Sequence, residues 1–366
     1  LSLLRNGDRA AVSGTLAIDR LDAHDLVPAL AGAASTVATA DSLWPEGPID
    51  VGSAPRALDG RIDVTVGTLT AGGNSSSNAT FGYDWDAQNV HLRDLTAALG
   101  GGTFTLDATV NPDFGQVEAD PAVLNLSAFE TFYQEKRPFF IEGTGIFRFD
   151  LTCHMGACSG LFYSRRIGRA PEITDTSTTA LLPEYTSIAG AGKLTGRTQH
   201  GLSVGYLDAV TQREAGSLGQ TLEPRANYFA GRLQQELGSG TASVGAILTG
   251  VNRQLDDFAA DSLRRTAYTG GVDFRRDFHD RDYRLSGYLT KSQVAGTPAG
   301  IAVTQASSTH YYQKPDDGER YDTTRTSLNG DAERLTFEKI NGTVQFQESF
   351  IRYSPGFEVN DIGFLT

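Results

Sequence analysis

The chain has 366 residues, of which 39% are hydrophobic and 20% are charged, so it can bury a core and is neither disordered nor of low complexity. The net charge of −13 argues against binding of a phosphate backbone, and no nucleic-acid partner is expected. No apolar run approaches the roughly 20 residues of a spanning helix, whereas a β-barrel, which is signalled by alternation, is not excluded.

The first 110 residues predict a strand-rich segment. Apolar and polar residues alternate over residues 61–66 and 103–107, which is typical of half-buried strands. Apolar residues at helical spacing predict one short helix over residues 22–34.

Three stretches of this segment share a strand-and-turn pattern without catalytic residues: residues 13–18 (SGTLAI), 57–64 (ALDGRIDV) and 89–102 (NVHLRDLTAALGGG). They resemble the strand-rich portion near the C-terminus of the AsmA family of envelope proteins. The resemblance implies an elongated β-sheet groove that handles lipid or supports outer-membrane assembly, and it implies no enzyme. The membrane-anchoring N-terminus of that family is missing here.

Residues 111–182 are dense in aromatic and charged side chains, which predicts a connecting or plug-like segment. Pro138 disfavours a helical conformation at the preceding residue, so Arg137 is expected to be extended. Two interpretations are open: a binding ledge, or docking of the segment against a sheet through ion pairs. The candidate binding residues of this segment are Glu135, Arg137, Phe139, Phe140, Glu142, Arg165 and Arg166.

The acidic residues of the same segment define no catalytic pair, since no spacing singles out the two carboxylates that a glycosidase needs. No catalytic residue is therefore proposed. Asp113, Glu118 and Asp120 offer hard oxygen ligands and are weak candidates for Ca²⁺, because the fixed spacing of a calcium loop is missing. No other cofactor is expected.

The only two cysteines, Cys153 and Cys158, have four residues between them. A zinc site would need more ligands nearby than His154 can supply. We therefore predict a local disulfide, formed in an oxidising compartment, over two free thiols.

The second half predicts long strands joined by alternating short and long connections, as in outer-membrane barrels. The strongest hairpin signal is Asn341-Gly342. Tyr283, Leu285, Gly287 and Leu289 share one face, opposite Arg284, Ser286 and Thr290, so arginine should be tolerated at Thr290 but not at Leu285 or Phe274. The expected strands cover residues 186–197, 201–211, 224–236, 241–251, 266–277, 282–292, 333–340 and 343–353.

Four short motifs carry a second resemblance, which runs from about residue 103 to the C-terminus. They read NPDF at 111–114, EKRPFF at 135–140, SRRIGR at 164–169 and SPGFEVNDIGF at 354–364. They resemble a Gram-negative family of outer-membrane β-barrels of unknown function, which usually carries an N-terminal carbohydrate-binding-type domain. That domain is replaced here by the AsmA-like stretch, so a chimera, a fusion and an assembled sequence are all open explanations.

The sequence thus predicts an all-β fold in three parts. These are an AsmA-like β segment (1–110), the charged, aromatic connecting or plug-like segment (111–182), and a truncated portion of an antiparallel transmembrane-type β-barrel (183–366). Tyr311 and Tyr312, in the longest connection, are further candidate binding residues because tyrosine offers a flat apolar face and a hydroxyl group.

We expect an outer-membrane protein, or one on the periplasmic side of the Gram-negative cell envelope, with a binding, transport or assembly role. The expected partners are outer-membrane lipid and either glycans or other envelope proteins. The alternative is a secreted or surface protein that binds or modifies carbohydrate, as the companion domain of the barrel family suggests. Dependence on detergent separates the two.

Overall fold

Long strands make up most of the chain in the computed structural model, which confirms the all-β class. The strands and the short helices belong to two compact units. Unit 1 comprises Leu1–Gln116, Ser187–Gln199 and Tyr206–Gln212, and unit 2 comprises Val117–Thr186, His200–Gly205 and Arg213–Thr366. The structure describes residues 2–6, 9–22, 58–71, 74–86, 89–99, 101–112, 126, 130–154, 157–173, 183–310 and 320–365.

Unit 1 is a sheet in which β2 and β3 run parallel, and the other neighbouring pairs from β1 to β9 are antiparallel. Val64, Val66, Phe81 and Leu92 pack together on one face as its core. The strands expected from alternation are confirmed, and the expected helix over 22–34 lies almost entirely outside the described residues. The strands, in sheet order, are β1 (Ser2–Asn6), β2 (Arg9–Asp22), β3 (Leu58–Ala71), β4 (Asn74–Trp85), β5 (Val90–Leu99), β6 (Gly102–Val110), β9 (Ile188–Arg197) and β10 (Leu202–Thr211), the last of which enters this unit from Tyr206 onward.

Unit 2 holds an antiparallel meander in which each strand pairs with the next along the chain. Five of the six have 12 or 13 residues, well above the usual strand length of about 5 or 6 residues. They are β13 (Ala226–Leu237), β14 (Ala242–Arg253), β15 (Thr266–Phe278), β16 (Tyr283–Ala295), β17 (Ser327–Lys339) and the shorter β18 (Phe346–Tyr353).

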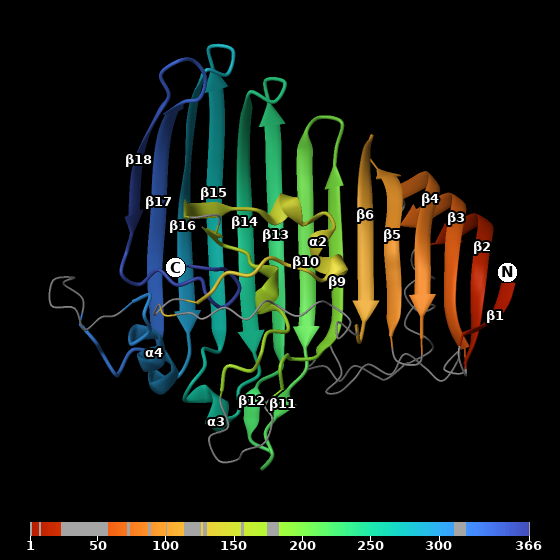
Figure 1. Cartoon of the computed structure of the whole chain (residues 1–366), viewed down its shortest axis with the longest axis horizontal. Coiled ribbons are helices and arrows are strands. Elements are labelled where there is room, and N and C mark those ends of the chain that lie inside the picture. Colours follow the sequence, from red (N-terminus) through yellow and green to blue (C-terminus); the bar gives the residue numbers. More distant parts are fainter. Residues whose placement is uncertain are drawn as a thin grey trace. The chain divides into compact units, whose positions relative to one another are not determined.

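The connections of unit 2 are short at one end of the meander and long at the other, as expected (Figure 1). The long ones contain β11 (Glu214–Ala215) with β12 (Thr221–Glu223), α3 (Asp257–Ala260) and α4 (Pro298–Gln305). No helix in the described part of the chain is long and apolar enough to cross a membrane.

Two details of the expected meander are wrong. Lys339 pairs with Phe346, so Asn341 and Gly342 lie in a longer connection rather than forming a two-residue hairpin. β17 begins at Ser327 instead of residue 333, because the backbone of residues 327–332 continues the ladder with β16.

One face of the meander is covered by the inner segment, defined as residues 130–154 and 157–173 (Figure 1). Phe149, Leu151 and Leu161 of this segment pack with Ile247 and Tyr288 of the sheet. The segment contains α2 (Pro138–Ile141), the 3₁₀ turns η1 (Thr144–Phe147) and η2 (Ser164–Arg166), and the hairpin of β7 (Asp150–His154) and β8 (Ala157–Gly160).

The C-terminal segment, residues 354–365, lies on the same face and bonds to the inner segment. Gly160 and Phe364 exchange backbone hydrogen bonds at 2.8 and 2.9 Å. The sheet approaches this layer closely at Gly271, where a Cβ atom would lie 2.9 Å from the ring of Phe149 and 3.1 Å from Leu161. We call the covered face of the meander the inner face and the opposite one the outer face.

Candidate functional site

The inner and outer faces of the meander differ in polarity. The hydroxyl of Tyr288 donates to the carbonyl of Leu151 at 3.1 Å, which places the even-numbered residues of β16 on the inner face. Thr290 and Ser292 follow on that face and are buried, whereas Leu289, between them in sequence, is 60% exposed. The alternation expected for this strand is therefore confirmed.

The outer face carries a continuous apolar band. Val272 and Leu248 are 51% and 53% exposed, although they lie in the middle of their strands. The charged residues of this face are Arg276 and Glu348 toward the short-turn end, and Lys291, Asp331, Glu333 and Arg352 on the part of β16–β18 in register with Leu248 and Leu289. The exposed aliphatic and aromatic residues of the band are Leu233, Leu237, Val244, Leu248, Val272, Phe274, Leu289, Leu335 and Phe350.

Aromatic side chains border this band at both ends. Phe229 and Tyr268 lie 6.2 Å apart, centroid to centroid, toward the long-loop end. At the short-turn end, Phe337 stacks on Tyr283 at 5.9 Å and on Phe278 at 6.5 Å. From Tyr268 to Phe278, β15 rises about 33 Å at roughly 3.3 Å per residue. At the strand tilt of roughly 40° that outer-membrane barrels have, such a rise would span about 25 Å, the height of their apolar band.

The inner face carries buried ion pairs beside the apolar contacts of Ile247 and Tyr288. Arg232 reaches from β13 across β14 to Asp273 on β15, at 2.5 and 3.0 Å, and its guanidinium lies 5.4 Å from the ring centroid of Phe149. Asp277 accepts two hydrogen bonds from Arg284, at 2.7 and 3.2 Å. The covered face thus holds buried charged side chains, whereas leucines are exposed on the outer face.

Six charged residues form an ionic cluster at the long-loop end of unit 2. At its centre, Asp361 is completely buried and accepts from Arg253 at 2.5 Å and from Arg264 at 2.8 Å. Arg253 also donates to Glu172 at 3.2 Å, so one arginine of β14 holds both the C-terminal and the inner segments. The members of the ionic cluster are Arg169, Glu172, Glu223, Arg253, Arg264 and Asp361.

The three acids of this cluster differ in pKa. Burial alone would raise the pKa of Asp361, but Arg264 and Arg253 outweigh it and hold that pKa well below its usual range. The pKa of Glu172 is lowered in the same way, by Arg169 and Arg253 acting against burial. Burial and the neighbouring Glu172 instead raise the pKa of Glu223, whose buried Oε1 has no hydrogen-bond partner among the described residues. Glu223 is thus the carboxylate that most readily takes up a proton.

Glu135 and Arg137 form a second ion pair, within the inner segment. Arg137 donates to both carboxylate oxygens of Glu135, at 2.9 and 2.7 Å, and also to the carbonyls of Ser164 and Ile167. Burial would raise the pKa of Glu135, but the hydrogen bonds from Arg137 and Ser164 lower it. Arg137 has the extended conformation (φ −74°, ψ 120°) expected before Pro138. The guanidinium is therefore fully engaged in holding two turns of the segment together.

The other candidate residues of the inner segment lie around this pair. The Arg137 guanidinium stacks 4.3 Å from the ring centroid of Phe140, which contacts Phe139 edge-to-face at 5.0 Å. Arg166 is buried and donates to Glu130 and to the carbonyl of Gly363, both at 2.9 Å. Arg165 donates to the carbonyl of Gln134 at 3.2 Å, and Glu142 is exposed at the end of α2.

Replacing Glu135 by glutamine should lower the free energy of unfolding by about 2 to 3 kcal/mol, because Arg137 loses a charged acceptor in a shielded position. Urea unfolding of the refolded chain measures the loss. Asp150→Asn is the matched control, since its partner Arg148 is exposed and the change should cost less than about 1 kcal/mol. If Glu135→Gln unfolds like the parent but loses binding of envelope lipids or glycans, Glu135 is a binding residue instead.

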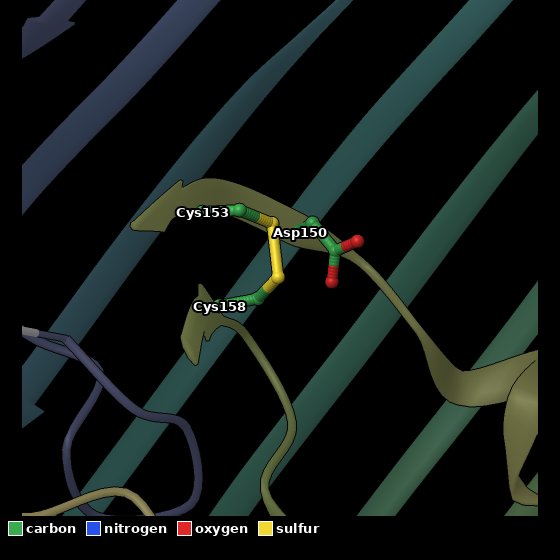
Figure 2. Close-up of side chains that lie close together, drawn as sticks. All are labelled: Asp150, Cys153 and Cys158. Carbon is green, nitrogen blue, oxygen red and sulfur yellow. A yellow bond between two sulfur atoms is a disulfide. The ribbon is translucent and has the colours of Figure 1, made fainter. Parts of the chain in front are cut away.

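Cys153 and Cys158 are bonded to each other, which confirms the predicted disulfide. They lie opposite one another in the hairpin of β7 and β8. Figure 2 shows the carboxylate of Asp150 beside the two sulfur atoms. Disulfide sulfurs are not thiolates, so this group offers a metal only one carboxylate.

Alkylation of the purified chain without reductant should therefore add no mass. A disulfide leaves no thiolate to react, and reduction before alkylation should add two labels. Intact-mass measurement reads both results directly. Two labels on the unreduced chain would show that the cysteines are free.

The remaining candidates cannot be placed. Asp113, Glu118 and Asp120, the weak Ca²⁺ ligands, and Tyr311 and Tyr312 lie outside the described residues. Their roles stay predictions.

A family model for a domain of unknown function (DUF5916) matches residues 101–366, which is more than half of the chain. The chain belongs to the DUF5916 family. The match starts close to the point where the barrel-family resemblance begins, and it covers the inner segment and the whole meander. No AsmA family model matches, and no curated protein and no solved structure matches.

The ionic cluster was not predicted from the sequence. Its central contact joins Arg253 to Asp361 across 108 positions, a separation at which no spacing rule applies. A signal was nevertheless present, since Arg169 and Asp361 lie in two of the short motifs that carried the barrel resemblance.

Proposed function

We propose that this DUF5916 chain supplies strands of an outer-membrane β-barrel whose inner segment occupies the lumen side, and that the protein binds or transports a ligand. The observation that carries the proposal is the aromatic-bordered apolar band on the outer face of β13–β18. Bands of this kind are where barrels contact lipid.

Energetics favour a lipid environment for this face. Soluble monomers rarely expose contiguous apolar patches beyond a few hundred Å², and this band extends over six neighbouring strands. Each fully exposed leucine in water forgoes about 1.5 to 3 kcal/mol of burial free energy, which contact with acyl chains would recover.

A binding or transport role is favoured over catalysis by what three of the buried acids do, although the pKa of Glu223 is raised. Asp361, Glu172 and Glu135 are each held by arginine with a lowered pKa, so none is suited to act as a general acid near neutral pH. Their contacts join the inner segment, the C-terminal segment and β14, as expected of a plug that is anchored to its barrel.

For residues 1–110, the AsmA-like role in handling lipid or in outer-membrane assembly stays part of the proposal. What supports it is the run of long strands β2–β6, with an apolar core on one face. The expected location is accordingly the outer membrane or the periplasmic side of the envelope.

The test is the behaviour of the full chain with and without a membrane mimic. We expect it to stay in vesicles through an alkaline carbonate wash, and to migrate differently on SDS gels before and after boiling. A chain that is monodisperse in buffer without detergent, with no heat-modifiable mobility, would favour the soluble carbohydrate-binding alternative.

A further inference from the structure

The hairpin that joins β15 and β16 lies at the short-turn border of the apolar band. A hollow of about 360 Å³ opens there, lined mainly by residues 276–281, with Thr241 from the neighbouring turn. Phe278 and Tyr283, the last and first residues of the two strands, belong to the aromatic border. In a membrane, this border lies at the level of the lipid headgroups.

The hollow presents guanidinium groups that the protein leaves available. The side chains of Arg276 and Arg281 are exposed, and neither makes a hydrogen bond or an ion pair within the described chain. Two carboxylates line the hollow, those of Asp277 and Asp280. Asp277 accepts two hydrogen bonds from Arg284, whereas Asp280 forms no ion pair with an arginine in the described chain.

The two borders of the band differ in charge. At the short-turn border, Lys339 adds a third cation, with its ammonium 5.7 Å from the ring centroid of Tyr283. At the long-loop border, Arg352 is instead paired with Asp331 at 2.8 Å and with Glu333 at 3.4 Å. Among the described residues, the short-turn border thus holds three cations without an ion-pair partner, Arg276, Arg281 and Lys339.

The backbone of this hairpin is also unusual. His279, Asp280 and Arg281 have φ values of 49°, 53° and 71°, three consecutive non-glycine residues in the left-handed region. Bulky residues such as arginine rarely adopt that conformation, and strained positions cluster where a ligand is held. The turn keeps Arg281 beside the hollow at a conformational cost.

We propose that this hollow binds the headgroup of an anionic phospholipid. Its phosphate would lie between Arg276 and Arg281, and its acyl chains along the outer face beside Phe274. Arginine suits this position because its aliphatic stem can lie against the apolar band while its guanidinium binds phosphate in a bidentate manner. The inference rests on the proposed membrane location and adds the lipid class and the site.

The test uses the full chain in phosphatidylcholine vesicles that contain a small fraction of spin-labelled lipid. Spin-labelled phosphatidylglycerol should be retained by the protein about fivefold over spin-labelled phosphatidylcholine, the preference that one basic residue provides beside an anionic lipid. Arg276→Gln with Arg281→Gln should reduce the ratio to about one. Glycerol phosphate at equal ionic strength should not displace the lipid, because it lacks acyl chains.

The matched control combines Lys291→Gln and Arg352→Gln, which removes the same charge from the outer face away from the short-turn border. It should keep the preference. A ratio near one in the parent, or a preference that survives loss of both hairpin arginines or falls equally in the control, would overturn the lipid site. Insertion is measured separately, by heat-modifiable mobility. A parent chain that does not insert refutes the membrane proposal rather than the lipid site. If the double variant does not insert, the single substitution Arg281→Gln tests the lipid site, because Arg281 lies outside the strands.

Discussion

Asp361→Asn is expected to lower the free energy of unfolding by about 3 to 5 kcal/mol, the cost of breaking a buried ion pair from one side. Asp361 is completely buried between Arg253 and Arg264, so the change removes the ion-pair partner of Arg264 and leaves Arg253 with Glu172 alone among the described residues. Urea unfolding of the refolded chain measures the loss. Asp331→Asn is the control, because its ion pair with Arg352 is exposed and should contribute less than about 1 kcal/mol.

The same contact predicts the pH dependence of stability. The folded pKa of Asp361 lies below its unfolded value, so its stabilisation is fully present above the unfolded pKa, near pH 4, and is lost as the pH falls toward the folded pKa. The parent should therefore lose stability below about pH 4, and Asp361→Asn should lose less. An equal acid dependence in both proteins would show that Asp361 is not held by its arginines.

Leu289→Arg is expected to destabilise the membrane-inserted chain by about 2 to 4 kcal/mol, because it places a charge on the lipid face of β16. The matched control is Gln293→Arg, on the same strand and face but outside the apolar band, which should cost no more than about 1 kcal/mol. Urea titration of folding into vesicles, followed by heat-modifiable mobility, measures both changes. In a water-exposed sheet both substitutions should be small and equal, and that result would contradict the lipid-facing assignment.

The meander was largely predictable, because one side of each strand faces a uniform environment and alternation is then read directly from the sequence. The hairpin of β15 and β16 shows this: the predicted strands 266–277 and 282–292 correspond to Thr266–Phe278 and Tyr283–Ala295. The start of β17 was missed because residues 327–332 contain Asn, Gly and Asp, which favour turns. Pairing with β16 outweighs that local preference.

Thr290 shows what alternation cannot reveal. Because it lies opposite the apolar face of its strand, Thr290 was expected to tolerate arginine. In the structure it is 4% exposed and donates to the carbonyl of Ala332 at 3.2 Å, so that expectation is wrong. The inner face is filled by the inner segment, and no local pattern states which face a separate segment will cover.

The candidate residues of the inner segment were found by their density of charge and aromatic groups, but their partners were not. Arg137 bonds to Glu135 two positions away, which short-range reasoning can anticipate. Arg166 instead bonds to the carbonyl of Gly363, across 197 positions, and such a contact depends on the whole fold.

The central claim, that the outer face of the meander contacts lipid, is tested most directly by spin labels along β16. Single cysteines at residues 285 to 293 can be labelled selectively, because the native cysteines are bonded to each other. In vesicles, we expect labels at Leu285 and Leu289 to be accessible to oxygen, which dissolves in the bilayer, and shielded from a water-soluble nickel complex, with the reverse at Gln293. If the nickel complex instead reaches the labels at Leu285 and Leu289 as readily as the label at Gln293, this face is exposed to water. That result would contradict the account.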